Sequence, residues 1–191
     1  MLGLLVIGLG NPDSHFEGTR HNVGFEVVET VASRVQLRMR KPLFGRYRRA
    51  RLPDSAESRG LTLIQPLTYM NRSGEVVPAL LRRYSLSAES MLVVCDNLDL
   101  APGRVRMKQG GGTAGHKGLA SIVDAVGHGN FPRLYLGVGR PQDGNVVEHV
   151  LGLPDAAERS VYDDAIVRAA EAVLALRDHS AQQVMNEINR R

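Results

Sequence analysis

Two kinds of hydrophobic pattern alternate along this chain, and each predicts a different element. Continuous apolar runs of roughly four to eight residues are typical of buried strands, whereas apolar positions repeating every three or four residues are typical of helices. Strands are predicted over residues 4–9, 43–52, 61–65, 91–95, 103–109 and 134–138. Helices are predicted over residues 22–37, 73–84, 116–126 and 154–176, and around Val184 and Ile188. The alternation predicts an α/β fold, a single domain over residues 1–191 with a twisted mixed β-sheet flanked by helices.

Two of the predicted elements carry a further signal. In the helix over 73–84, Ser73 stands where it can cap the first turn, although Pro78 lies inside the segment. The strand over 103–109 alternates basic and apolar residues, and its basic members are Arg104, Arg106 and Lys108. Because successive side chains of a strand point to opposite faces, this strand is expected to present one cationic face.

Size and composition narrow the class of protein. A chain of 191 residues is long enough to bury a core of its own. None of its apolar runs approaches the roughly 20 residues that span a bilayer, so no membrane partner is expected. The one cysteine, Cys95, excludes an internal disulfide framework and a multi-thiolate metal site. It fits the reducing cytoplasm, where we expect the protein to act.

The charge pattern favours a polyanionic partner. The chain carries 24 basic and 20 acidic side chains, and the basic excess lies before residue 154. Residues 34–51 and 100–123 each contain several basic side chains and no acidic one. Solvated basic faces are the ordinary interpretation of such stretches, and contacts to nucleic-acid phosphates are the functional one. With no tryptophan and few aromatic residues, a broad base-stacking platform is not expected.

Polar residues stand directly after two of the predicted strands. Asn11 follows the first strand, in a glycine-rich turn, and Asp96 follows the strand over 91–95. Ligands of open α/β sheets bind at the carboxyl ends of the strands, so both residues are candidates for one site. A dinucleotide-binding fingerprint would need a glycine where Asp13 stands, which disfavours a nucleotide-dependent enzyme. A tight turn at Asn11 and a cap or turn role for Asp96 stay open as alternatives.

His21 brings acid–base chemistry to the predicted start of a helix, where Asn22 follows it. A buried carboxylate such as Asp96 can orient an imidazole and stabilise its charged form. Asn71 can donate to and accept from a peptide or carbonyl group, or simply help to start the next helix. The sequence has no zinc motif, P-loop or G-x-S-x-G elbow. Catalysis would therefore use water activated by a histidine.

These segments together resemble bacterial peptidyl-tRNA hydrolases over nearly the whole chain. In chain order, the matching segments are Val6-Ile7-Gly8-Leu9-Gly10-Asn11-Pro12, Phe16-x-x-Thr19-Arg20-His21-Asn22-x-Gly24, Pro66-Leu67-Thr68-Tyr69-Met70-Asn71-x-Ser73-Gly74, Asp96-x-Leu98-Asp99-Leu100 and Gly110-Gly111-Gly112. The resemblance implies metal-free hydrolysis of the ester that joins a peptide to the tRNA 3′ ribose, which frees the tRNA for reuse. It also implies a monomer that contacts the acceptor stem and 3′ end of peptidyl-tRNA.

The resemblance further implies roles for individual residues. The histidine that matches His21 is the general base in such enzymes, and the aspartate that matches Asp96 orients it. The asparagines that match Asn11 and Asn71 bind the peptide and help to position the ester, which makes Asn11 a catalytic candidate. The remaining residues expected at the substrate are Phe16, Asn22, Tyr69, Met70, Lys117 and Val150. The residues expected to hold tRNA phosphates are Lys108, Arg106 and Arg133.

The chain departs from the family pattern at three places. It reads His116-Lys117-Gly118-Leu119 where the family usually has His-Asn-Gly-Leu. It has Tyr135 where the family's tRNA clamp has an arginine, and Phe16 where the family often has a tyrosine. We expect Lys117 to replace the missing amide in part, by its charge. The alternative is a non-catalytic RNA-binding protein of the same fold, a chloroplast splicing factor being one that resembles this family.

Overall fold

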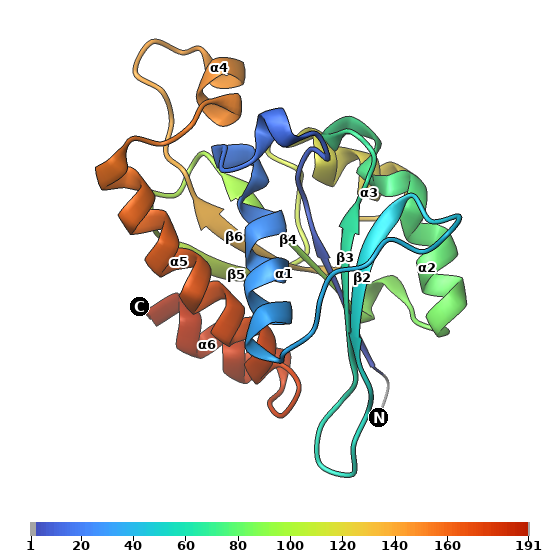
Figure 1. Ribbon diagram of the computed structural model, residues 1–191. Coiled ribbons are helices and arrows are strands. Elements are labelled where there is room, and N and C mark those ends of the chain that lie inside the picture. The colour runs from blue at the N-terminus through green and yellow to red at the C-terminus, as the bar shows by residue number, and fades with distance from the viewer. Residues whose placement is uncertain (1–2, 191) are drawn as a thin grey trace.

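Six strands form one mixed sheet with helices on both faces (Figure 1), in the computed structural model that describes residues 3–190. The strands are β1 Leu4–Gly8, β2 Tyr47–Leu52, β3 Leu61–Pro66, β4 Met91–Asn97, β5 Val105–Gln109 and β6 Pro132–Gly137. Their order across the sheet is β2-β3-β1-β4-β6-β5. The four central strands run parallel, while β2 and β5 are antiparallel edge strands. The predicted fold class is confirmed.

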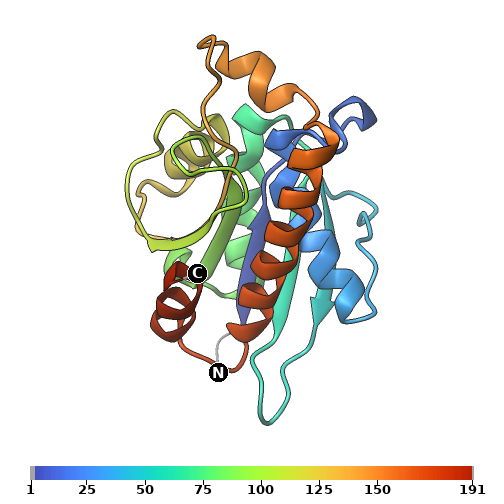
Figure 2. The same cartoon turned by 90° about the vertical axis from the view of Figure 1, so that its left-hand side faces the viewer.

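The helices are α1 Val23–Arg34, α2 Val77–Tyr84, α3 Lys117–Val126, α4 Val146–Leu151, α5 Ala156–Ala175 and α6 Ala181–Arg190. The apolar cores on the two faces of the sheet follow from strand alternation. In β1, Val6 packs with α1, α5 and α6, whereas Leu5 and Ile7 pack with α2 and α3. Figure 2 shows α5 running along one face of the sheet beside α1. Among the described residues, none of the helices combines the length and apolar character that a bilayer span requires.

The loops at the carboxyl ends of the central strands and α4 lie at one end of the molecule, which is the upper end in Figure 1. Four short 3₁₀ helices connect the longer elements: Ser14–Phe16, Arg20–Asn22, Met70–Val76 and Ala88–Ser90. His149 of α4 approaches the carbonyl of Val138, just after β6, with a distance of 2.9 Å from Nε2. This contact places α4 over the sheet edge where ligands of open α/β sheets bind.

Two glycines bring the start of α1 close to the strand ends. A Cβ on Gly24 would lie 2.4 Å from the carbonyl oxygen of Val94 in β4, and a Cβ on Gly8 would lie 2.2 Å from the carbonyl oxygen of Gly24. Neither approach leaves room for a side chain. Because the helix begins this close to β1 and β4, His21 in the turn before α1 stands beside the end of β4.

The structure corrects the predicted start of α2. Residues Met70–Val76 form a 3₁₀ helix, and α2 begins only at Val77. The Ser73 hydroxyl donates to the carbonyl of Met70 at 2.9 Å, so its predicted capping role is wrong. Pro78 lies in the first turn of α2, where a missing backbone N–H costs no hydrogen bond.

Two further boundaries differ from the prediction. The strand expected over 43–52 begins only at Tyr47, and Leu43 and Phe44 project into solvent before it. The helix expected to reach residue 37 ends at Arg34, because Gln36 takes a left-handed conformation with φ 56°. The helix α4 was not predicted, since its six residues carry no repeating apolar pattern.

Candidate active site

His21, Asp96 and His116 meet at the carboxyl end of β4. His21 Nδ1 lies 2.7 Å from Asp96 Oδ1, and His116 Nε2 lies 3.0 Å from the same oxygen. The Asp96 side chain is only 3% exposed, whereas His21 is 12% exposed and lines a cleft of about 570 Å³. The sequence predicted the pairing of His21 with Asp96, but it gave His116 no role at the site.

The hydrogen bonds fix the proton positions on both imidazoles. His116 Nδ1 accepts from the backbone N–H groups of Gly118 and Leu119, so its proton lies on Nε2 and points to Asp96. Asp96 also accepts from Nδ1 of His21, which leaves Nε2 of His21 unprotonated. No described residue offers this Nε2 a hydrogen bond, so it is available as a base in the cleft.

Asp96 is ionised in this arrangement. Burial opposes its ionisation, but the hydrogen bonds from His116 and His21, together with the charge that each imidazole carries when it is protonated, outweigh burial. The pKa of the Asp96 carboxyl therefore lies well below its ordinary value. A carboxylate in this position holds the His21 tautomer and stabilises the imidazolium that forms when His21 takes a proton.

Asn11 is held rigidly at the carboxyl end of β1. Its Oδ1 accepts from the backbone N–H of Met70 at 2.9 Å, which fixes the orientation of the amide. Its Nδ2 donates to none of the described residues, and Asn11 lines the cleft. The side-chain amide of Asn22 bonds both backbone groups of Asn11, at 2.8 and 3.0 Å. Asn22 is buried and is not among the residues that line the cleft, so in this structure it positions Asn11, and its substrate contact stays a prediction.

The structure brings most of the other predicted substrate residues together. The predicted residues that line the cleft beside His21 are Phe16, Tyr69, Met70, Asn71, Lys117 and Val150. Tyr69 donates its hydroxyl to Asp13 at 2.9 Å, and Asn71 and Lys117 are exposed. The cleft therefore combines apolar walls with a few polar groups, as small-molecule and peptide sites do.

The predicted phosphate contacts divide into two kinds. Arg106 and Lys108 are exposed on β5, on the cationic face that the sequence predicted. Arg133 is 0% exposed and donates to the carbonyls of Gly111, Gly112 and Gly129. A guanidinium enclosed in this way cannot reach a tRNA phosphate, so the prediction for Arg133 is wrong. It holds instead the loop of glycines that leads from β5 to the cleft.

His116 is the residue that the sequence interpretation missed. A signal was present, since His116 directly precedes Lys117 in a segment already compared with the family. Its position was unpredictable because the loop 110–115 decides how far His116 lies from Asp96, and loop geometry is not encoded in a hydrophobic pattern. Tyr135 also lines the cleft, and its hydroxyl accepts a bond from Arg133 at 3.2 Å.

The cluster also has the composition of a metal site. Ligand atoms of His21, Asp96 and His116 all lie within 4.8 Å of one another. The donor–acceptor distances are those of hydrogen bonds, and the tautomers of both imidazoles are satisfied without an ion. Activity without metal stays a prediction, which a chelator tests directly.

The fold and the cleft together define a class of protein, an α/β protein whose histidine–carboxylate pair is the arrangement that hydrolases use to activate water. The family model described as peptidyl-tRNA hydrolase matches residues 5–191. The chain belongs to the peptidyl-tRNA hydrolase family.

Individual relatives agree with the family model. A peptidyl-tRNA hydrolase of Halalkalibacterium halodurans is 40% identical over 187 residues, which cover 97% of this chain and 99% of the relative. One of Neisseria gonorrhoeae is 42% identical over 172 residues, 88% of each chain. The crystal structure of peptidyl-tRNA hydrolase from Acinetobacter baumannii superposes with a TM-score of 0.90 at 38% identity, covering 98% of this chain and 94% of that one.

Proposed function

We propose that the cleft hydrolyses the ester between a peptide, or an N-blocked aminoacyl group, and the 3′ ribose of tRNA. The observation that carries this proposal is the pairing of His21 with Asp96 in the cleft of a chain of this family. His21 Nε2 accepts a proton from water while the water oxygen bonds to the ester carbonyl carbon. The bond to the ribose oxygen then breaks, and the imidazolium returns the proton to that oxygen. The products are free tRNA and a carboxylic acid.

Asn11 Nδ2 is the donor that we assign to the carbonyl oxygen, which becomes negative in the transition state. One well-placed donor of this kind is worth roughly 3 kcal/mol. The Met70 N–H holds the other end of the amide, so the donor is oriented before substrate arrives. Asn71 is available to bond the peptide backbone, and Val150 provides an apolar wall of the same cleft.

The tRNA body is assigned to the β5 edge of the sheet. Arg106 and Lys108 are exposed there, and a Cβ on Gly111 would lie 3.1 Å from Lys108 Nζ. Lys108 thus lies on the solvent side of the glycine loop, whereas Arg133 contacts the same loop from the protein interior. We propose that these two basic side chains contact phosphates of the acceptor stem, and that residues 1–191 act as a cytoplasmic monomer without a metal or cofactor.

The Lys108→Ala variant is expected to weaken binding of tRNA and to flatten its salt dependence. Each phosphate contact contributes about one unit to the slope of log K against log salt, so the slope should fall by about one. Equilibrium binding of deacylated tRNA at several salt concentrations measures this slope. An unchanged slope would remove Lys108 from the tRNA contact.

The Lys117→Ala variant is expected to lower kcat/KM roughly two- to fivefold, the size of an exposed charge interaction. Lys117 is the first residue of α3, where a cation is unfavourable next to the helix dipole, so its loss is not expected to lower the melting temperature. Lys117→Asn, which restores the amide usual in the family, is the matched control and should retain the rate. Unchanged rate and affinity in Lys117→Ala would show that the charge has no part in the reaction.

Hydrolysis in ¹⁸O-labelled water tests the proposed bond cleavage. Attack of water on the carbonyl carbon places the label in the carboxylate of the released N-blocked amino acid and leaves the tRNA 3′ hydroxyl unlabelled. Label in the tRNA hydroxyl would contradict the mechanism. Binding of tRNA without any turnover would favour the non-catalytic RNA-binding alternative.

A further inference from the structure

A basic hollow outside the active site lies along the outer edge of β2. Its volume is about 1060 Å³, and it lies between the segment 36–42, β2 and the end of α2. We call it the β2-edge groove. Six basic side chains line it, namely Arg38, Arg40, Lys41, Arg49, Arg51 and Arg83, and no acidic side chain does. The mechanism above uses none of them.

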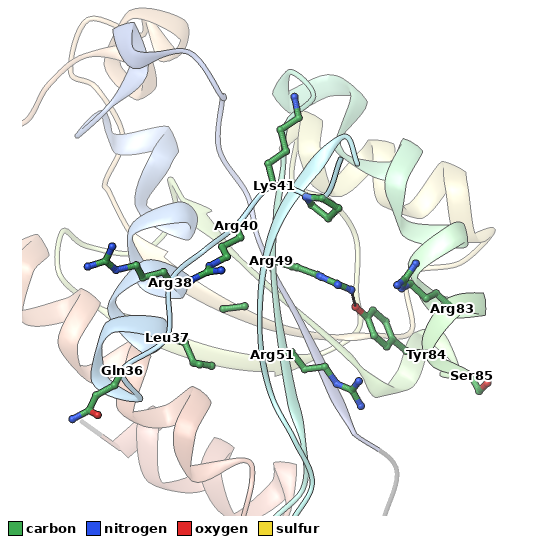
Figure 3. A pocket seen from close by; sticks show the side chains of 12 residues that line it. Gln36, Leu37, Arg38, Arg40, Lys41, Arg49, Arg51, Arg83, Tyr84 and Ser85 are labelled. Atoms are coloured by element: carbon green, nitrogen blue, oxygen red, sulfur yellow. Dashed lines mark hydrogen bonds between the residues drawn. The ribbon is translucent and has the colours of Figure 1, made fainter. Parts of the chain in front are cut away.

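Backbone and ring contacts hold part of the groove in place. Arg40 and Arg49 exchange two backbone hydrogen bonds of 2.8 and 2.9 Å, which fix the segment before β2 against the strand. Arg49 donates to the Tyr84 hydroxyl at 3.1 Å, and the Arg51 guanidinium lies 5.9 Å from the centre of the Tyr84 ring. Figure 3 shows Arg49 and Arg51 on the side of Tyr84, and Arg38 and Arg40 on the other side of the strand.

The cations of the groove lack acidic partners. Among the described residues, none of the six forms a salt bridge, although seven arginine–carboxylate pairs occur elsewhere. Crowding unpaired like charges costs free energy, which a bound polyanion would offset. A nucleic-acid duplex carries one charge per roughly 1.7 Å of its axis, so it would bring several phosphates to a hollow of this size.

The groove and the proposed tRNA contact lie at opposite edges of the sheet. Strands are spaced about 4.8 Å apart, so β2 and β5 are separated by about 24 Å across the six-stranded sheet. If the acceptor stem leaves the cleft along β5, as the proposed function has it, the stem leads away from β2. The groove therefore stays open while the substrate is bound.

We propose that the β2-edge groove binds the phosphodiester backbone of a second RNA helix, distinct from the tRNA whose 3′ end occupies the cleft. This inference rests on the proposed function for the placement of the substrate on β5. Because its cations lie on both sides of a strand, the hollow fits a curved phosphodiester backbone better than it fits a flat membrane surface. Leu43 and Phe44, which are 87% and 94% exposed beside Lys41, make an anionic membrane the competing occupant.

The test compares two variants with the same loss of charge. Arg51→Gln/Arg83→Gln removes two cations from the groove and spares Arg49, which bonds Tyr84. Arg59→Gln/Arg190→Gln removes two cations outside the groove. Fluorescence anisotropy measures binding of a short blunt-ended RNA duplex, which has no single-stranded 3′ end to enter the cleft. Hydrolysis of N-blocked aminoacyl-tRNA gives kcat/KM, and melting temperatures verify folding.

The groove variant is expected to bind the duplex at least tenfold more weakly, with a salt slope smaller by about two, and to keep the wild-type kcat/KM. The control should keep both properties. Lys108→Ala, which removes one proposed acceptor-stem contact on β5, should lower kcat/KM and should weaken duplex binding less than the groove variant does. Equal loss of duplex affinity in both double variants would show that binding depends on the overall charge of the protein and not on the groove, which would overturn the proposal.

Three other results would also overturn it. A parallel fall of kcat/KM in the groove variant would show that the groove holds the substrate tRNA itself. Unchanged duplex affinity in the groove variant would exclude the groove as an RNA site. If the groove variant lost binding to phosphatidylglycerol vesicles but kept its duplex affinity, the groove would be assigned to a membrane. Absence of turnover by the wild-type protein would contradict the proposed function instead, while the duplex measurement would still test the groove.

Discussion

Replacement of His21 by alanine is expected to lower kcat for N-blocked aminoacyl-tRNA by about 10²-fold or more, the usual contribution of a positioned general base. In the structure, Nε2 of His21 is free in the cleft. Nδ1 of His21 donates a hydrogen bond to Asp96, with 2.7 Å between Nδ1 and Oδ1. The phosphate and peptide contacts lie elsewhere, so KM should change little. Single-turnover and steady-state kinetics together separate the loss in rate from any loss in binding.

His179→Ala is the matched control, because His179 is exposed near the C-terminal end of α5 and lies outside the cleft. It should leave both kcat and KM at wild-type values. If His21→Ala retained most of the wild-type kcat while its melting temperature was unchanged, the base would have to be another group, and the assignment of His21 would be wrong.

Replacement of Asp96 by asparagine is expected to lower kcat about 10²- to 10⁴-fold with little change in volume. The carboxylate accepts from both His21 and His116 through one oxygen. An amide offers one acceptor and one NH₂ donor, so the two imidazoles can no longer keep their present tautomers and positions. The charge that stabilises the His21 imidazolium is lost as well.

The same substitution has a pH signature in stability. The pKa of Asp96 is lower in the folded protein than its value of about 3.9 in an unfolded chain. A lowered pKa contributes stability that is present above about pH 4 and is lost as the pH falls through the folded-state value. The melting temperature of wild type should therefore fall more steeply below pH 4 than that of Asp96→Asn.

Asp124→Asn provides the control for Asp96, since Asp124 is exposed on α3 and forms no salt bridge among the described residues. It should keep the wild-type kcat. Parallel melting curves of wild type and Asp96→Asn across the acid range would contradict the lowered pKa. A kcat for Asp96→Asn near wild type would show that the carboxylate does not orient the base.

The hydrophobic pattern predicted the strands and the edge of the sheet at which the site lies. It succeeded because β1 and β4 are buried and parallel, so polar residues at the carboxyl end of each strand reach the same edge of the sheet. Asn11 and Asp96 were located in this way. Strand alternation likewise predicted the exposed basic face of β5, because Val105 and Met107 must pack against the core.

The pattern could not predict hydrogen bonds between distant segments. Arg133 was expected at a phosphate because it lies two residues before the position of the family's clamp arginine, but carbonyl groups of the glycine loop enclose its guanidinium. Asn22 was expected at the substrate, yet its amide is used by the backbone of Asn11. His116 was overlooked because its approach to Asp96 depends on the path of that loop. Each of these outcomes depends on tertiary contacts that local sequence does not specify.

The most direct test of the account is turnover of N-blocked aminoacyl-tRNA by the wild-type protein in excess EDTA, with His21→Ala measured beside it. We expect rapid release of tRNA by wild type, no stimulation when divalent metal ions are added back, and a loss of about 10²-fold or more in the variant. Turnover that stopped in EDTA and returned with metal would contradict the account and make His21, Asp96 and His116 a metal site.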